Sequence, residues 1–158
     1  MGMQLNIGDH ASPRAGYQAF PGSKQDTARW ARTRARAIAA GMPSANVYFK
    51  TLPSGRSLSD ILNDSSIWVN YHATSGLFGE AEIGGKELMI GIRSFRMGKW
   101  TVLATLIHEL AHINGAPTGA STQAEEALLH CGLGKMSEFN SGVDDPHTPY
   151  MPGAPGAG

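Results

Sequence analysis

The chain has 158 residues, enough for one domain with a substantial core and too few for two domains of ordinary size. Its 13 Lys and Arg balance 13 Asp and Glu, so the charge favours neither a nucleic acid nor an anionic membrane as a partner. No apolar run approaches the roughly 20 residues of a spanning helix, and the N-terminus lacks a secretory signal pattern, so we expect a soluble protein and assign it no compartment.

Glycine and proline punctuate both ends of the chain. We expect residues 1–22 to form an irregular lead-in, residues 23–150 to form the folded domain, and residues 151–158 to be a flexible tail. A single cysteine, Cys131, excludes an internal disulfide and a cysteine-cage metal site, and it is expected to be a small buried side chain.

The first predicted element is a helix over residues 26–40, where alanine and arginine are abundant. Asp26 can cap its start, Gly41 can supply a left-handed exit, and Pro43 prevents its continuation. Three arginines lie on one side of this helix, and we expect a solvated face, with phosphate binding as the alternative. These are Arg29, Arg32 and Arg36.

The middle of the chain predicts strands with one short helix between them. Residues 46–52 and 66–73 have the β-branched and aromatic content of strands, and residues 57–64 are expected to be helical. Residues 77–92 contain two extended runs joined at Gly84-Gly85, which predicts a β-hairpin. The order of elements predicts an α+β domain with a mixed sheet.

Residues 101–114 predict a helix that carries a narrow polar stripe on an otherwise apolar surface. At 100° per residue, His108, Glu109 and His112 fall within one arc of about 100°, while the leucines and isoleucines occupy the arc behind them. Two imidazoles one turn apart can bind one zinc ion, and the glutamate after the first reaches a water on that metal. This pattern therefore predicts Zn²⁺ held by His108 and His112, with Glu109 as the general base.

The sequence His108-Glu109-Leu110-Ala111-His112 resembles the motif of the zincin superfamily of zinc metallopeptidases. In its metzincin branch a glycine and then a third histidine follow. This chain has Gly115 at the glycine position but Thr118 at the third ligand position, and a threonine hydroxyl is a poor zinc ligand.

In the gluzincin branch, the third ligand is a glutamate on a following helix. Residues 121–134 predict such a helix, with Glu125 and Glu126 as the two candidates. The run from Glu126 to His130 is similar to the ligand segment of thermolysin-like peptidases, so the resemblance implies Glu126 as the third ligand and Glu125 as the alternative. The doubled glutamate and glycine-rich exit also look like the zinc-protease domains of bacterial toxins and injected effectors.

The resemblance, which covers roughly residues 77–134, implies a zincin-like α+β domain. Its mixed sheet would be backed by the residue 26–40 helix and would present the last hairpin strand beside the active-site helix. Either hairpin strand would bind an extended peptide by strand addition. His147 or Tyr150 could stabilise an oxyanion, and Asp144 or Asp145 could support the metal site, although exposed tail and turn positions explain all four.

We therefore expect a zinc-dependent metallopeptidase that acts on a peptide or protein substrate. The toxin-like segment suggests an effector domain secreted or injected by bacteria, for which an immunity or inhibitor protein would be a further partner. Two alternatives stay open: a zinc amidase that acts on peptidoglycan, and a non-catalytic binding module stabilised by zinc.

Overall fold

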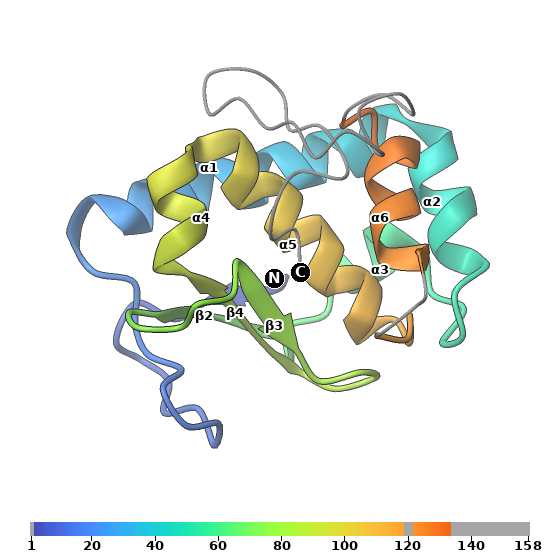
Figure 1. Cartoon of the computed structure of the whole chain (residues 1–158). Coiled ribbons are helices and arrows are strands. Elements are labelled where there is room, and N and C mark those ends of the chain that lie inside the picture. Colours follow the sequence, from blue (N-terminus) through green and yellow to red (C-terminus); the bar gives the residue numbers. More distant parts are fainter. Residues whose placement is uncertain (1, 119–121, 134–158) are drawn as a thin grey trace.

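The computed structural model describes residues 2–118 and 122–133, which form an α+β domain with a four-stranded mixed sheet and six helices (Figure 1). The strands are β1 (Gln4–Leu5), β2 (Trp68–His72), β3 (Gly79–Ala81) and β4 (Glu87–Gly91), and their order in the sheet is β1-β2-β4-β3. The first three in this order are parallel, and β3 runs antiparallel to β4.

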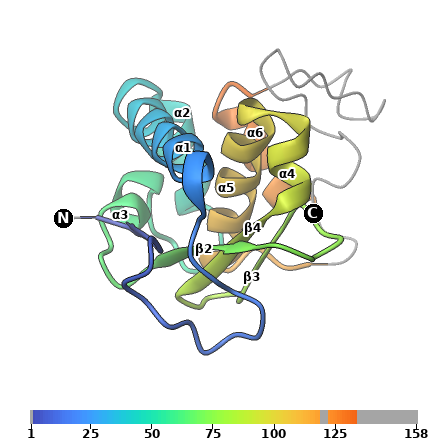
Figure 2. The same ribbon diagram turned by 90° about the vertical axis from the view of Figure 1, so that its left-hand side faces the viewer.

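The helices are gathered on one side of the sheet, which gives a two-layer arrangement (Figures 1 and 2). They are α1 (Gly22–Gly41), α2 (Pro43–Lys50), α3 (Leu58–Leu62), α4 (Ile92–Met97), α5 (Lys99–Ile113) and α6 (Gln123–His130). Within residues 2–118 and 122–133, no helix has the length and apolarity needed to cross a bilayer.

The two faces of the sheet have different surroundings: one packs against the helices and the other faces away from them (Figure 1). Alternate side chains of β2 and β4 belong to the hydrophobic core, as expected when successive side chains point to opposite faces. These core residues are Val69, Tyr71, Leu88 and Ile90. The residues between them, including the fully buried Asn70 and the nearly buried Glu87, point to the other face.

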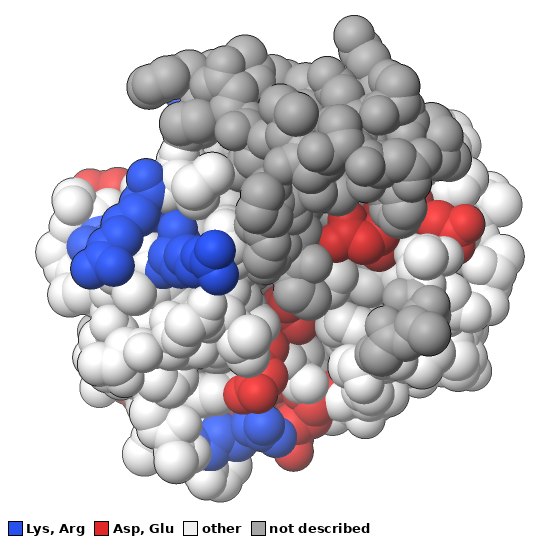
Figure 3. All heavy atoms as spheres, in the orientation of Figure 1, with Lys and Arg blue, Asp and Glu red and all other residues white. Residues whose placement is uncertain are grey.

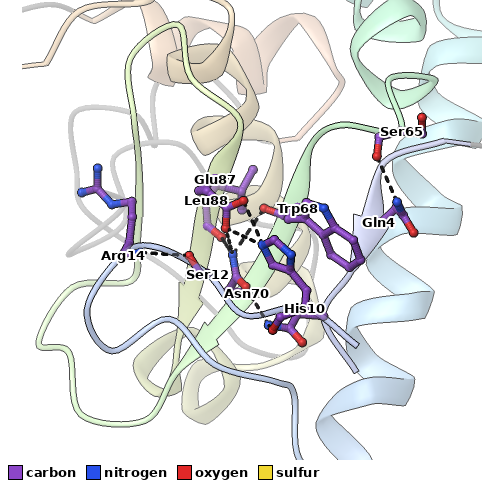
Figure 4. A network of polar contacts seen from close by, with 10 residues as sticks. Gln4, His10, Ser12, Arg14, Ser65, Trp68, Asn70, Glu87 and Leu88 are labelled. Carbon is purple, nitrogen blue, oxygen red and sulfur yellow. Dashed lines mark hydrogen bonds and ion pairs between the residues drawn. The ribbon is translucent and has the colours of Figure 1, made fainter. Parts of the chain in front are cut away.

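A polar network joins that face to the segment between β1 and α1 (Figure 4). Asn6 Nδ2 donates to Asn70 Oδ1 at 2.8 Å, and Asn70 Nδ2 donates to Glu87 Oε1 at 3.0 Å. His10 Nε2 lies 3.0 Å from both Glu87 oxygens, and its ring stacks on Trp68 with 4.1 Å between centroids. The N-terminal segment, expected to be an irregular lead-in, thus contributes strand β1 and part of a buried polar network. Both depend on contacts with β2 and β4, which the local composition of the segment does not indicate.

The helix predicted over residues 26–40 is confirmed as α1, but its two ends differ from the prediction. It begins at Gly22 after Pro21, so Asp26 lies inside the helix, where it pairs with Arg29 at 3.4 Å instead of capping. Gly41 is helical and does not adopt a positive φ, because the chain leaves the helix through an extended Met42.

The strand predicted over residues 46–52 is wrong, because most of this segment lies in helix α2. Pro43 takes the first helical position, where its missing N–H costs nothing, and Ala45 and Phe49 are buried one turn apart. The helix predicted over residues 57–64 is confirmed as α3, whose Ser57 Oγ accepts from Asp60 N at 3.1 Å. The strand predicted over residues 66–73 is also confirmed as β2.

The hairpin is confirmed, with Gly84 at φ +70° in its turn, and the order of the sheet decides which of its two strands forms the edge. The last hairpin strand, β4, lies inside the sheet between β2 and β3, and the first, β3, forms the edge. Helix α5 packs against both hairpin strands, with α1 and α6 on its other sides. All residues from Thr101 to Ile113 are buried, so the polar stripe of α5 faces protein instead of bulk solvent.

Candidate metal centre

Helix α5 brings the two motif histidines together at one point. Residues four apart lie one above the other on a helix, and His108 Nε2 is 3.2 Å from His112 Nε2. Both side chains are nearly buried, with 5% and 6% exposure. Burial lowers the pKa of His112, which favours the neutral imidazole that metals bind.

The hydrogen-bond partners of these rings define which nitrogen can accept a cation. His112 Nδ1 is 2.7 Å from the Ala116 carbonyl oxygen, which can only accept, so the proton is on Nδ1 and Nε2 carries a lone pair. His108 Nδ1 has no hydrogen-bond partner among the described residues, and Glu125 Oε1 lies 3.4 Å from it. The lone pair of His112 Nε2 faces His108 Nε2 at 3.2 Å, where it can accept a proton carried by His108 or bind a metal cation.

Glu109 is a carboxylate held in an apolar, acidic environment. Its side chain is 1% exposed, and Oε2 has no hydrogen-bond partner among the described residues. Burial raises the pKa of Glu109 well above its usual range, and the nearby charges of Glu80 and Glu125 raise it further. A carboxylate in this position has lost its hydration, which a cation beside it would compensate.

The cleft beside Glu109 lies against the edge strand. A cavity of about 180 Å³ opens there, and it is lined by Leu77, Gly79, Glu80, Ala81, Glu109, His112 and Thr118. Thr118, which stands at the metzincin ligand position, therefore reaches the cleft without providing a strong metal donor. Figure 3 shows acidic side chains near β3 and near α6 on this face, with basic atoms beside those near β3, where Arg14 pairs with Glu80 and Glu82 at 3.4 Å.

Gly79 allows the edge strand to approach helix α5 closely. A Cβ added at this position would lie 2.5 Å from Thr105 Cγ2 and 2.9 Å from Glu109 Oε2. Composition did not reveal this role, but a glycine inside a predicted strand is a recognised signal for close approach of another element. The turn glycine Gly84 donates its N–H to the His112 carbonyl at 3.0 Å, so the hairpin is attached to α5 at both its strand and its turn.

Side chains from α4 complete this attachment. Ser94 Oγ donates to the Phe78 carbonyl at 2.8 Å and, having used its only proton, accepts from Thr105 Oγ1 at 2.8 Å. The sequence analysis assigned no role to Thr105 and did not predict α4. The bonds hold the start of β3 beside the polar face of α5.

The structure separates the two candidate third ligands. Glu125 lies beside the histidine pair, at 3.4 Å from His108, and its charge influences both His112 and Glu109. Glu126 Oε2 instead accepts from the Tyr48 hydroxyl at 3.2 Å, and the Tyr48 ring stacks on His130 with 4.3 Å between centroids. Helix α6 therefore turns Glu126 and His130 toward α2, away from the histidines.

The predicted zinc ligands do not form a complete set in this arrangement. Among residues 2–118 and 122–133, no three His, Cys, Asp or Glu side chains are placed to hold one metal ion. His108 and His112 offer two nitrogen donors, and Glu109 offers a carboxylate beside them. Asp144, Asp145, His147 and Tyr150 lie outside the described residues.

Comparison with known proteins gives no family to which the chain can be assigned, because no family model, curated protein or solved structure matches it.

Proposed function

We propose that this protein is a zinc-dependent metallopeptidase with a zincin-like active site. The proposal is carried by one observation: two buried imidazole Nε2 atoms stand 3.2 Å apart beside a buried carboxylate that has an unpartnered oxygen. A helix whose histidines and glutamate were incidental would not need to bury all three against the edge of a cleft.

The spacing of the two nitrogens fits a shared zinc ion. Zinc–nitrogen bonds of about 2.0–2.1 Å at tetrahedral angles separate two donors by about 3.3–3.4 Å, close to the observed 3.2 Å. The bond from His112 Nδ1 to the Ala116 carbonyl also supports the fit, since metal-binding histidines usually donate their other N–H to a carbonyl or carboxylate.

We assign the third protein ligand to Glu125 in preference to the Glu126 that the thermolysin-like resemblance implies. Glu125 already approaches His108, whereas Glu126 is engaged by Tyr48. Glu125 contacts Nδ1 of His108, so its carboxylate must move to the Nε2 side to become a ligand, and the Glu126 alternative is tested by the same experiment.

The chain's own groups then have distinct tasks in hydrolysis. Zinc, when bound, polarises the substrate carbonyl and lowers the pKa of its water from 15.7 to about 7. Glu109 takes the proton from the attacking water and passes it to the leaving amine, because its carboxylate lines the cleft and has an oxygen available. Strand β3 ends the sheet, so its outer edge can pair with an extended peptide and hold the scissile bond over Glu109.

The toxin-like segment that contains Glu125 supports an effector role, and an immunity or inhibitor protein would then cover the cleft. Its substrate would be a protein of a target cell. A peptidoglycan amidase would use the same chemistry, so digestion of purified murein must be measured beside cleavage of unfolded proteins. A zinc-stabilised binding module would show bound metal with no cleavage of either substrate.

The proposal is tested by zinc content and cleavage in wild type and matched variants. We expect one zinc per chain, loss of zinc in His112→Ala and Glu125→Gln, and retention of zinc in Glu126→Gln. His130→Ala is the histidine control, because His130 is exposed and stacks on Tyr48. Failure of metal-free wild type to take up zinc would refute the proposal, and zinc loss in Glu126→Gln alone would return the third ligand to Glu126.

A further inference from the structure

A second cavity lies at the opposite edge of the sheet from the histidine pair. It measures about 370 Å³ and lies between α1 and the N-terminal segment that contains β1. Figure 2 shows this segment beneath α1, on the side away from β3. Its side-chain lining is dominated by Arg29, Arg32 and Arg36, with Asp9 as the one acidic residue.

Helix geometry explains why the three arginines meet there. They are spaced by three and four residues, so they share one face of α1. Arg36 is drawn over the N-terminal segment, since a Cβ added to Gly2 would be 2.8 Å from Arg36 Nη2. The sequence analysis expected a solvated face, and Arg29 and Arg36 are indeed exposed, while Arg32 is half-buried where β1 forms a cavity against this face.

Two of the three arginines that line this cavity, the half-buried Arg32 and the exposed Arg36, form no ion pair with a described residue. Arg32 Nη1 donates to the Met3 carbonyl at 3.3 Å, while its buried Nε has no partner among the described residues. Arg29 pairs with Asp26 at 3.4 Å, on an exposed surface, and neither Arg32 nor Arg36 forms an ion pair with a described residue. Burial lowers the pKa of Arg32, and the positive charges of Arg36 and Arg29 lower it further, which shows an uncompensated positive field.

The backbone of β1 offers a further hydrogen-bond donor near this cavity. In β1, Gln4 and Asn6 donate their N–H groups toward β2, to the carbonyls of Ile67 and Val69. Successive residues of a strand alternate, so the N–H of Leu5, which lines the cavity, points away from β2. The cavity therefore combines guanidinium donors with a backbone donor, the combination that proteins use for phosphate groups.

We propose that this cavity binds a small phosphorylated molecule through Arg32 and Arg36, with Arg29 at its rim. Because Arg29 is paired with Asp26, Arg32 and Arg36 stand against Asp9, and two positive charges less one negative charge leave one net positive charge on the lining. The two guanidinium groups offer several N–H donors, which match the three acceptor oxygens of a phosphoryl group. The volume is larger than a phosphate group requires and lies within the ~300–1,000 Å³ of small-molecule sites, so an organic part of the ligand has space beside the phosphate.

The test is calorimetric titration of the metal-free protein with inorganic phosphate and with pyrophosphate, at constant ionic strength in chloride. Metal-free protein excludes phosphate bound through a metal at the histidine pair. We expect saturable binding that weakens about tenfold or more in Arg32→Gln and in Arg36→Gln, because each removes a charge-assisted hydrogen bond. Arg34→Gln is the matched control: it removes the same charge from α1, but Arg34 lies over the Trp100 ring.

The same protein is sedimented with phosphatidylcholine vesicles that contain or lack phosphatidic acid. Binding that requires phosphatidic acid and Arg36 would identify a lipid headgroup as the source of the phosphate, and binding only to the soluble anions would identify a soluble ligand. Arg36 is exposed, so its replacement leaves the fold intact, which thermal unfolding verifies. The proposal is overturned if phosphate and pyrophosphate do not bind at millimolar concentration, if succinate binds instead, or if Arg34→Gln weakens binding as much as Arg36→Gln.

Discussion

Replacement of Gly79 by alanine tests the contact between the edge strand and the catalytic helix. The backbone at Gly79 is that of a strand and has no positive φ, so alanine brings no backbone strain and acts only through its added methyl group. That methyl would lie 2.5 Å from Thr105 Cγ2, where an ordinary contact begins near 3.4 Å, so the two elements must separate by about 0.9 Å. Thr105 is held by Ser94, which prevents an easy rotation away from the contact.

The expected loss of stability follows from overpacking. Inserting a methyl group into a closely packed interface costs about 1–3 kcal/mol. For a domain of this size, each kcal/mol corresponds to about 2–4 °C in Tm, so a cost of about 2 kcal/mol lowers Tm by about 4–8 °C. The melting curve should be recorded with a metal chelator present, so that the result does not depend on bound zinc.

Gly76→Ala is the matched control for this experiment. Gly76 is exposed, has no positive φ, and a Cβ there meets no atom within 4 Å. It should be neutral or stabilising by up to about 1 kcal/mol, since alanine restricts the unfolded chain. If Gly79→Ala were as stable as Gly76→Ala, β3 could not be seated against α5 as described, and the cleft geometry would be wrong.

Peptide cleavage should respond to the same substitution. The new methyl is also 2.9 Å from Glu109 Oε2, so relief of the contact moves either the base or the strand expected to hold substrate. A displacement near 1 Å at a reacting group costs on the order of 100-fold in rate. Gly79→Ala should therefore lose most of its activity at temperatures where it is fully folded, whereas Gly76→Ala should keep the wild-type rate.

Three further predictions concern single side chains. Glu109→Gln should retain zinc but cleave peptide about 10²–10⁴-fold more slowly, and an unchanged rate would remove Glu109 from the mechanism. Hydrogen bonds from Lys86 and Ser66 hold the pKa of Asp64 well below its usual 3.8, so its stabilisation is complete above that pH and is lost on acidification. Asp64→Asn should cost about 1–2 kcal/mol at pH 7, and the difference from wild type in urea unfolding should shrink below pH 4. Tyr48→Phe should cost about 1 kcal/mol without changing zinc content; zinc loss in this variant would instead support Glu126 as a ligand.

Sequence reasoning succeeded where one local pattern dominates. Residues one turn apart on α5 must share a face, so the meeting of His108 and His112 follows from helix geometry alone. The hairpin followed from its glycine turn. Residues 46–52 failed for the opposite reason: Tyr48 and Phe49 favour a strand by composition, but Pro43 starts a helix and burial of Phe49 at the helical spacing from Ala45 outweighs that preference.

The third ligand depends on information that no local pattern contains. Glu125 and Glu126 are adjacent on α6, and 100° of rotation about the helix axis decides which one faces α5. That rotation is fixed by burial of Ala124, Ala127 and Leu128 and by the Tyr48 contact from α2, a helix that the sequence analysis assigned as a strand. The orientation of the two neighbouring carboxylates thus depends on a distant element that the sequence analysis assigned wrongly.

The arginine cavity likewise depends on contacts between distant parts of the chain, which the local sequence does not indicate. Helical spacing correctly placed Arg29, Arg32 and Arg36 on one face of α1, but whether that face meets water or protein depended on the N-terminal segment. This segment pairs as β1 with β2, more than sixty residues later in the chain, and so forms a cavity against part of the face. Arg29 and Arg36 stay exposed and Arg32 is half-buried, so the strand pairing keeps the charged surface and adds a cavity in which an anion can contact its guanidinium groups.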